Sequence, residues 1–255
     1  MQEKIALIDT DSILYTCFNP NKVLDAWGEP IKENGKFVYV DKTEDEIKAS
    51  ADTIFTQIFE RTKCTHYIGF VKGKNTIKRR LDINPTYKQN RTGDKPKFLE
   101  FTKQYFIDKW KIYTADDYEV DDYICSLKRM LPNSFICAID KDLLNIEGTN
   151  YNWRKNEWTT TTKDQELYYL AASLITGDTI DGVKGLNRKG IKFVEKLFAG
   201  ELPENYFPLV LKEYIKEYGV YNGVKEYFKT YFSLKILDEL PDKNLESVIP
   251  IKVYV

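Results

Sequence analysis

Residues 4–9 read KIALID, an unbroken apolar run that ends in an acid, and this stretch decides the fold expected for the chain. Such a run is typical of a strand that is buried on both faces within a parallel sheet, with Asp9 at its C-terminal tip. Three later runs, at residues 65–71, 110–114 and 134–140, repeat the design and are separated by helical periodicity. The alternation predicts an α/β fold with a mainly parallel sheet flanked by helices, in which ligands bind at the carboxyl ends of the strands.

The remaining segments predict two regions and two insertions. Residues 27–40 predict a β-hairpin closed by Asn34-Gly35. Residues 72–98 combine Lys, Arg, Pro and Gly with little apolar periodicity, which predicts a mobile basic loop or arch. The last third of the chain has helical apolar spacing. We therefore expect a core at residues 1–163 and a helical region at residues 164–255.

The composition is that of a folded, water-soluble protein. Of the 255 residues, 42% are hydrophobic and 30% are charged, which excludes an intrinsically disordered chain. No apolar run approaches the roughly 18 residues needed to span a bilayer, and the N-terminus shows no signal-peptide pattern. We expect a cytoplasmic monomer without a membrane partner.

The cysteines and the histidine exclude several kinds of catalytic site. Cys17, Cys64, Cys125 and Cys137 are scattered without a CxxC pair, which favours reduced, buried thiols. The single histidine, His66, begins an apolar run and is expected to be structural. His-rich zinc sites are therefore excluded, and a Ser-His-Asp hydrolase would depend on this one residue.

Charge is unevenly distributed along the chain. The net charge is −1 at pH 7, yet residues 72–111 contain twelve Lys or Arg against four acids. The rest of the chain is therefore acidic. This segregation fits a phosphate-binding face opposite a carboxylate site.

Four groups of acids stand where a predicted strand ends or a predicted helix begins. They are Asp9 with Asp11, Glu119 with Asp121 and Asp122, Asp140 with Asp142, and Asp178 with Asp181. Acids at helix N-termini are also ordinary caps, so each group alone is more simply explained as structural. Four such coincidences favour a common site.

The spacing within these groups favours bound dications. Glu119 and Asp122 share one helix face, and Asp178 and Asp181 have the same separation in a glycine-flanked turn. Like charges this close repel, and a bound dication is the simplest compensation. Oxygen ligands without Cys or His select Mg²⁺ or Mn²⁺ over zinc. Two such ions suit in-line phosphodiester hydrolysis, because they activate water and stabilise the attacking and leaving oxygens.

The order of five motifs carries a family resemblance. They are Ile8-Asp9, Tyr87-Lys88-Gln89-Asn90-Arg91, Glu119-Val120-Asp121-Asp122, Ile139-Asp140-Lys141-Asp142-Leu143, and GDTIDGVKG at residues 177–185. In this order the chain resembles the flap endonuclease or 5′-3′ exonuclease family, and it looks most similar to the bacteriophage 5′-nucleases and the 5′-nuclease domain of bacterial DNA polymerase I. The match runs from Asp9 to about Leu240.

This resemblance implies a PIN-like nuclease core that holds two ions, Mg²⁺ or Mn²⁺. The implied ligands are Asp9, Glu119, Asp121, Asp122 and Asp140 at one site, and Asp142, Asp178 and Asp181 at the other. Asp9 and Asp140 are thereby also implied in catalysis.

The basic segment is implied to contact the substrate. By resemblance, Lys88 and Arg91 face the scissile phosphate from the base of an arch, and Tyr87 stacks on a terminal base. A cation beside the transferred phosphate stabilises developing charge, and an aromatic ring can hold an unpaired nucleotide. Arg79 and Arg80 are expected to contact nucleic acid as well.

Residues 177–198 resemble the family's helix-three-turn-helix element, which grips the duplex backbone. Its glycines allow backbone amides to approach phosphate, and its cations add charge. The residues expected to bind nucleic acid here are Lys184, Gly185, Arg188, Lys189, Gly190 and Lys192. The implied partner is DNA with a 5′ flap, a gap or a 5′ end, or an RNA–DNA hybrid, and a K⁺ ion is implied at the turn.

One position departs from the family pattern. Family members commonly carry an aspartate at the end of the second core strand, where this chain has Val71 and no acid between Cys64 and Arg80. The first metal site then has one ligand fewer, unless Asp11 compensates. A plain helix cap is the preferred interpretation of Asp11.

Two other functions stay open. Asp9 and Asp11 after an apolar strand also resemble the nucleophile loop of haloacid-dehalogenase-type phosphatases, in which an aspartate forms a phosphoenzyme. That interpretation leaves the Glu119 group and the basic segment unexplained. A non-catalytic nucleic-acid-binding descendant of the nuclease fold would account for Val71, but an unused acidic cluster is electrostatically costly and repels DNA.

Overall fold

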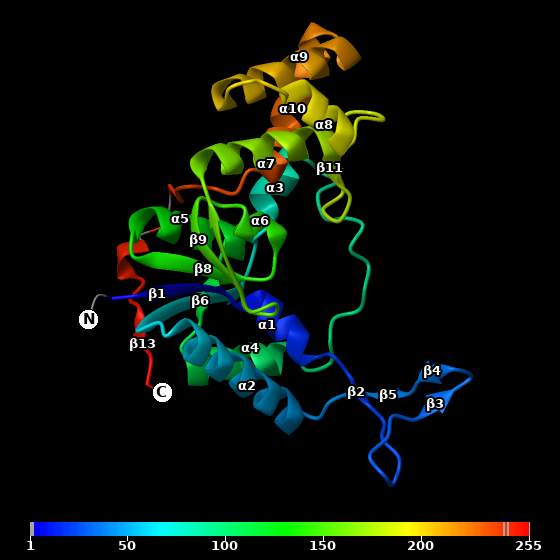
Figure 1. Ribbon diagram of the computed structural model, residues 1–255, viewed down its shortest axis with the longest axis vertical. Coiled ribbons are helices and arrows are strands. Elements are labelled where there is room, and N and C mark those ends of the chain that lie inside the picture. Colours follow the sequence, from blue (N-terminus) through cyan, green and yellow to red (C-terminus); the bar gives the residue numbers. More distant parts are fainter. Residues whose placement is uncertain (1–2, 242, 244, 255) are drawn as a thin grey trace.

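The sheet at the centre of the molecule is mainly parallel. In the computed structural model, which describes residues 3–241, 243 and 245–254, its strand order is β10-β9-β8-β1-β6-β13, with β7 also paired to β6 (Figure 1). β1 (Ile5–Asp9) lies between β8 (Ser134–Ala138) and β6 (His66–Lys72) and is parallel to both. Every residue of β1 is buried, as its unbroken apolar run predicts. The expected α/β fold is confirmed.

Other strands extend this sheet on both sides. β9 (Gly148–Asn152) runs parallel to β8, and β7 (Tyr113–Ala115) runs parallel to the end of β6. β10 (Glu157–Thr161) is antiparallel to β9, and β13 (Ile251–Lys252) is antiparallel to the start of β6. The sheet is therefore mixed only at its edges.

Helices cover both faces of the sheet because its central strand is apolar on both sides. Ala6 and Ile8 of β1 belong to one buried cluster, together with side chains of α1 (Thr10–Cys17), α2 (Glu44–Thr62) and α4 (Leu99–Trp110). The alternate residues of β1, Ile5 and Leu7, belong to a second cluster on the opposite face. That face is covered by α5 (Val120–Met130), and the short α6 (Lys141–Leu144) follows β8 (Figure 1).

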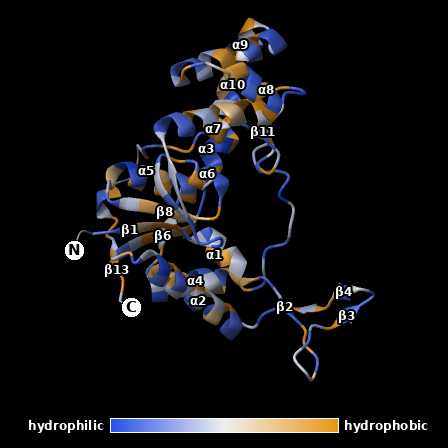
Figure 2. Ribbon diagram, viewed as in Figure 1, coloured by the Kyte–Doolittle hydropathy of each residue, from blue (hydrophilic) through white to orange (hydrophobic). Residues whose placement is uncertain are grey.

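A helical region stands beyond one face of the sheet, at the top of Figure 1. It comprises α7 (Lys163–Thr176), α8 (Ile191–Phe198), α9 (Tyr206–Tyr218) and α10 (Val220–Leu234). These helices share a separate apolar cluster that includes Leu174, Val194, Val210 and Tyr227. Figure 2 shows hydrophobic and hydrophilic residues interspersed along these helices.

The C-terminal segment corrects the expectation that all of residues 164–255 belong to the helical region. After α10 the chain returns to the sheet, where Leu240 and Leu245 join the cluster that covers Leu7. β13 then pairs with β6. Apolar residues at helical spacing also occur in irregular segments that pack on a core. The periodicity of the sequence therefore did not reveal that the chain returns to the sheet after α10.

Two further expectations about local structure were wrong in part. The segment 72–98 is not wholly irregular, because α3 (Lys78–Ile83) lies within it and contacts α10. The strand expected at residues 110–114 starts later, since Trp110 is the last residue of α4 and is packed on Phe55.

A β-arm projects from the core between α1 and α2 (Figure 1). It contains β2 (Asn21–Lys22) paired with β5 (Tyr39–Val40), and β3 (Lys32–Glu33) paired with β4 (Lys36–Phe37). Asn34 and Gly35 connect β3 and β4 with φ of 49° and 78°. Positive φ at both central residues is the signature of the tight hairpin turn predicted from Asn-Gly.

The cysteines agree with a further expectation from composition. All four cysteines are buried and free of disulfides. Among the described residues, every helix is too short or too polar to cross a membrane.

Candidate active site

Carboxylates from four separate segments line one hollow of about 600 Å³. It lies where β1 and β8 end, as expected for parallel strands whose carboxyl ends meet at one edge of a sheet. We call this space the acidic hollow. Its acids are Asp9, Asp11, Glu119, Asp121, Asp140, Asp142, Asp178 and Asp181. Of the acids singled out in the sequence, only Asp122 lies outside it.

The same local design presents the acids at the ends of β1 and β8. Asp9 ends β1 and caps α1, because its carboxylate accepts the N–H of Ser12 at 3.4 Å. Asp140 follows β8 and caps α6, with its Oδ1 accepting the N–H of Asp142 at 2.8 Å. An N-cap residue keeps the extended backbone conformation of the preceding strand, and its side chain is hydrogen-bonded to the first turn of the helix. The carboxylate is therefore held at the tip of the strand.

The turn at the end of α7 supplies Asp178 and Asp181. Oδ1 of Asp178 accepts the N–H groups of Ile180 and Asp181 at 2.8 and 3.2 Å, which fixes the turn. Gly177 and Gly182 flank it with φ of 71° and 67°, a conformation that glycine adopts without steric cost. The predicted glycine-flanked turn is therefore present.

Repulsion among the acids is not fully compensated by the protein. Burial first, and then the charge of Asp11, raises the pKa of Asp9 to about 7. Burial and the nearby charges of Asp9 and Asp140 raise the pKa of Asp121 well above its usual range. Removal from water, followed by Asp140, raises the pKa of Asp142 to about 6. Carboxylates with this degree of mutual repulsion attract a bound cation.

The base of the basic loop contacts the acidic hollow directly. Lys88 pairs with Glu119 and lies 3.5 Å from Asp181, and Arg91 also pairs with Asp181. The backbone of the loop is tied to the same turn, because the N–H of Lys88 donates to the carbonyl of Asp181 at 2.8 Å and the side chain of Asn90 donates to the carbonyl of Thr179 at 2.7 Å. The mobile loop expected from the sequence is thus anchored at residues 88–91.

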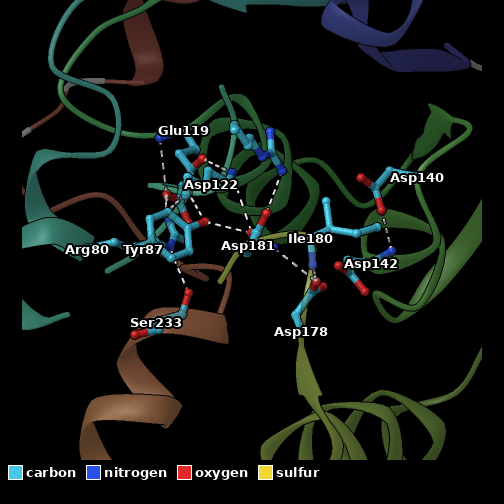
Figure 3. A network of polar contacts seen from close by, with 12 residues as sticks. Arg80, Tyr87, Glu119, Asp122, Asp140, Asp142, Asp178, Ile180, Asp181 and Ser233 are labelled. Atoms are coloured by element: carbon cyan, nitrogen blue, oxygen red, sulfur yellow. Dashed lines mark hydrogen bonds and ion pairs between the residues drawn. The ribbon is translucent and has the colours of Figure 1, made fainter. Parts of the chain in front are cut away.

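Asp122 and Arg80 correct two expectations. Arg80 Nη1 and Nη2 donate to the two carboxylate oxygens of Asp122 at 2.7 and 2.8 Å, and both side chains are buried (Figure 3). The carboxylate also accepts the backbone N–H of Glu119 and of Leu237. Asp122 therefore has its four lone-pair positions occupied and is no metal ligand in this structure, and Arg80 is shielded from nucleic acid.

Tyr87 is also placed differently from the expectation. Its ring is 2% exposed, and its hydroxyl lies 2.7 Å from Glu119 and 3.0 Å from Asp181. A buried ring cannot stack on a nucleotide, so Tyr87 instead supports the wall of the acidic hollow. Arg79 is half-buried and lies beside Tyr118 and Lys243 in a different groove.

Glu119 is compensated by two cations, Arg80 and Lys88. Burial alone would raise its pKa, but the cations Arg80 and Lys88 hold the pKa of Glu119 below its usual value. Figure 3 shows Arg80, Tyr87 and Glu119 gathered on one side of Asp181, with Asp140 and Asp178 on the other. The acidic hollow therefore has a compensated side and an uncompensated side.

Tyr15 and Lys72 also line the acidic hollow and did not stand out in the sequence. Tyr15 lies one helical turn after Asp11 on α1, so the spacing of four residues could have identified it. Lys72 lies at the end of β6 and was counted only as part of the basic segment.

The donor set fits a hard divalent cation. Among the described residues, no three His, Cys, Asp or Glu side chains are already arranged as a metal site. The lining of the acidic hollow nevertheless offers eight carboxylates and no His or Cys. Oxygen donors of this kind suit Mg²⁺ or Mn²⁺.

The residues expected to grip duplex DNA lie outside the acidic hollow, on the turn that leads into α8. Lys184, Arg188, Gly190 and Lys192 are exposed. Gly185 packs closely against the backbone of residues 175–177. Lys189 differs from the expectation, because it is half-buried and paired with Glu213 at 3.0 Å and Glu217 at 3.6 Å.

The structure is similar to solved nuclease structures, although the chain matches no protein-family model and no curated protein. The T5 D15 protein co-crystallised with metal ions has a TM-score of 0.64 at 12% identity, covering 91% of this chain and 90% of that one. A mutant of T5 5′-exonuclease has a TM-score of 0.60 at 12% identity, covering 93% and 88%. The catalytic core of Rad2 in complex with DNA substrate has a TM-score of 0.50 at 14% identity, covering 93% and 75%. The chain therefore has the PIN-like fold of the 5′-exonuclease and flap endonuclease structures, as its motif order implied.

Proposed function

We propose that the protein is a divalent-metal-dependent 5′-nuclease that hydrolyses phosphodiester bonds of DNA with a 5′ flap, a gap or a 5′ end. The observation that carries this proposal is the meeting of acids from β1, α5, β8 and the α7–β12 turn in one hollow that Lys88 and Arg91 also line. The shared fold with metal-bound T5 D15 protein supports it.

The chain's own residues divide into two roles in this proposal. Asp9, Asp121 and Asp140 would hold one Mg²⁺ or Mn²⁺ ion, and Asp178 with Asp142 would contribute to a second. When bound, such a pair of ions activates water and stabilises the attacking and leaving oxygens of an in-line displacement.

The cations on the other side of the acidic hollow bind and orient the substrate. Lys88 and Arg91 pair with acids in this structure, and a phosphate entering beside Asp181 would compete for the same donors. Their backbone anchor at Asp181 holds them in place, so little ordering is required when the substrate binds. Fixed cations at this position stabilise the charge that develops on the phosphate.

The exposed turn before α8 is the proposed duplex-binding surface. Lys184, Arg188 and Lys192 are available to phosphates there, and Gly190 leaves open space beside its backbone. Contacts of this kind bind the backbone without reading sequence. A K⁺ ion bridging this turn to DNA is part of the proposal.

The test is cleavage of a 5′-labelled flap DNA in Mg²⁺, Mn²⁺ and EDTA, with blunt duplex and single-stranded DNA as controls. We expect metal-dependent cutting near the junction, and loss of cutting without loss of DNA binding in Asp140→Asn and Asp178→Asn. A matched control is Asp108→Asn, because Asp108 lies on α4 away from the acidic hollow. Wild-type turnover in both site variants would refute the assignment of the site.

The second candidate is a nucleic-acid-binding protein without catalysis. It is favoured by Val71, which is buried and leaves the tip of β6 without an acid. Binding of flap DNA with no cutting in Mg²⁺, Mn²⁺ or Co²⁺ would establish it. A phosphatase that uses Asp9 as nucleophile would leave unexplained why Asp121, Asp178 and Asp181 line the same hollow.

A further inference from the structure

We infer that Asp11 is a direct ligand of the metal ion held beside Asp9, supplied from α1 in place of an acid at the tip of β6. This inference rests on the proposed function and names a ligand that the shared fold does not assign. It starts from the tip of β6, where Val71 is buried and apolar and the next residue, Lys72, points its backbone N–H toward α1.

Asp11 is held over this tip by a single hydrogen bond. Its Oδ1 accepts the N–H of Lys72 at 2.9 Å, although the two residues are 61 positions apart. This bond bridges α1 to the neighbouring strand and fixes the direction of the carboxylate. It occupies one lone pair of four, so the carboxylate keeps the capacity to bind a cation.

The ordinary explanation for an acid in the first turn of a helix does not apply to Asp11. The N-cap of α1 is Asp9, whose side chain accepts the N–H of Ser12. Asp11 accepts from another strand instead and lines the acidic hollow with Asp9 and Asp140. The plain helix cap preferred on sequence grounds is therefore wrong, and the carboxylate lies instead between the acidic hollow and the groove that Asp116 lines.

The arrangement is costly without a cation. Asp9 and Asp11 are two residues apart on one helix start, and both face the same hollow. The lysines whose charges act on Asp11 are Lys103, Lys72 and Lys88, but none of them forms an ion pair with it among the described residues. A dication between the two carboxylates compensates both at once.

Asp116 is a matched control for Asp11, because it makes the same kind of bond to a backbone N–H two residues after Lys72. Oδ1 of Asp116 accepts the N–H of Lys74 at 2.7 Å, which is the same kind of bond that Asp11 makes to Lys72. Asp116 lines a neighbouring groove and not the acidic hollow. Replacing either acid by asparagine preserves an oxygen acceptor for the backbone and removes one charge.

The experiment is titration of MnCl₂ into DNA-free protein, with free Mn²⁺ measured by electron paramagnetic resonance. We expect Asp11→Asn to weaken the tightest Mn²⁺ site by at least about tenfold, because loss of even an outer-shell partner costs that much. Asp9→Asn is expected to weaken it as well, and Asp116→Asn to leave it unchanged. Thermal unfolding in EDTA checks that every variant is folded, and Asp11→Ser replaces Asp11→Asn if the latter is not.

The outcomes separate this inference from the proposed function. Wild-type Mn²⁺ affinity in Asp11→Asn together with weakened binding in Asp9→Asn would overturn the role of Asp11 alone. No Mn²⁺ binding by the wild-type protein would overturn the proposed metal site and, with it, the inference. Equal weakening in Asp11→Asn and Asp116→Asn would show a general charge effect and would also overturn it.

Discussion

The guanidinium of Arg80 and the carboxylate of Asp122 form a buried pair with two parallel hydrogen bonds of 2.7 and 2.8 Å. Arg80 also donates to the carbonyls of Ser233 and Lys235, so the pair joins α3, α5 and the end of α10. We expect Arg80→Met to lower the free energy of unfolding by about 3–5 kcal/mol, because it leaves the buried charge of Asp122 unpaired. We expect a smaller loss in Asp122→Leu, because Arg80 keeps its ion pair with Glu119 at 2.7 Å. Urea unfolding measures this loss.

The double variant is the control for this prediction. Arg80→Met with Asp122→Leu removes both charges together, so its loss of stability is expected to be smaller than the sum of the two single losses. Additive losses would contradict the interpretation that the pair, rather than the packing of each side chain, holds these elements together.

Stability without metal is expected to fall as the pH rises from about 4 to about 7. In the folded protein the pKa of Asp9 is raised to about 7 and that of Asp142 to about 6, against an ordinary value of 3.8. The folded state therefore holds protons that the unfolded state has lost, and this stabilisation disappears as the pH passes through the folded pKa values. Melting temperatures in EDTA measure the effect.

Two comparisons test its origin. Asp9→Asn is expected to flatten the pH dependence, and saturating Mn²⁺ is expected to reverse its sign, because the metal binds the deprotonated acids. If the melting temperature of Asp9→Asn still falls steeply with rising pH, groups other than Asp9 cause the pH dependence.

Lys88→Ala is expected to lower the rate of flap cleavage by at least about 10²-fold, as removal of one fixed group that stabilises developing charge does elsewhere. Mn²⁺ affinity is expected to be kept, because Lys88 pairs with Glu119 and Asp181, which are not among the proposed metal ligands. Single-turnover cleavage and Mn²⁺ titration measure the two properties. Lys225→Ala on α10, an exposed site away from the acidic hollow, serves as the control. Joint loss of metal binding and cleavage would show that Lys88 has only a structural role.

Two glycines of the duplex-binding turn are expected to respond differently to alanine. A Cβ on Gly185 would lie 2.2 Å from the carbonyl oxygen of Ile175 and 2.4 Å from the nitrogen of Gly177, and backbone atoms cannot give way. We expect Gly185→Ala to cost about 1–3 kcal/mol of stability, as overpacking does. Gly190→Ala meets nothing within 4 Å, so it is expected to keep the melting temperature while weakening duplex binding. The opposite pattern would contradict the assignment of this surface.

The exposed cations of the same turn and the ion-paired Lys189 are expected to have different roles. Lys184→Ala and Arg188→Ala remove exposed charges, so each is expected to weaken duplex binding and to reduce the slope of log affinity against log salt by about 1. Lys189→Ala removes one of the two lysine partners of the buried Glu213 and is expected to lower stability instead. Binding at several salt concentrations, with melting curves alongside, separates the two classes. An unchanged salt slope in Lys184→Ala would remove that residue from the interface.

The sequence by itself determined the elements whose cause is local. The unbroken apolar run of β1 required burial on both faces, and Asn34-Gly35 required a tight turn, because these properties depend on a few neighbouring residues. The acids at the tips of β1 and β8 were identifiable for the same reason, since parallel strands bring their carboxyl ends to one edge.

Only the tertiary structure decided which acids serve the acidic hollow. Asp121 and Asp122 are neighbours on α5, and successive residues of a helix point about 100° apart, so one faces the hollow and the other faces the interior. Which of them turns inward is decided by Arg80, 42 residues earlier in the chain. The bond from Lys72 to Asp11 likewise spans 61 residues. Contacts between such distant residues follow from how the elements pack, and no local pattern of the sequence records them.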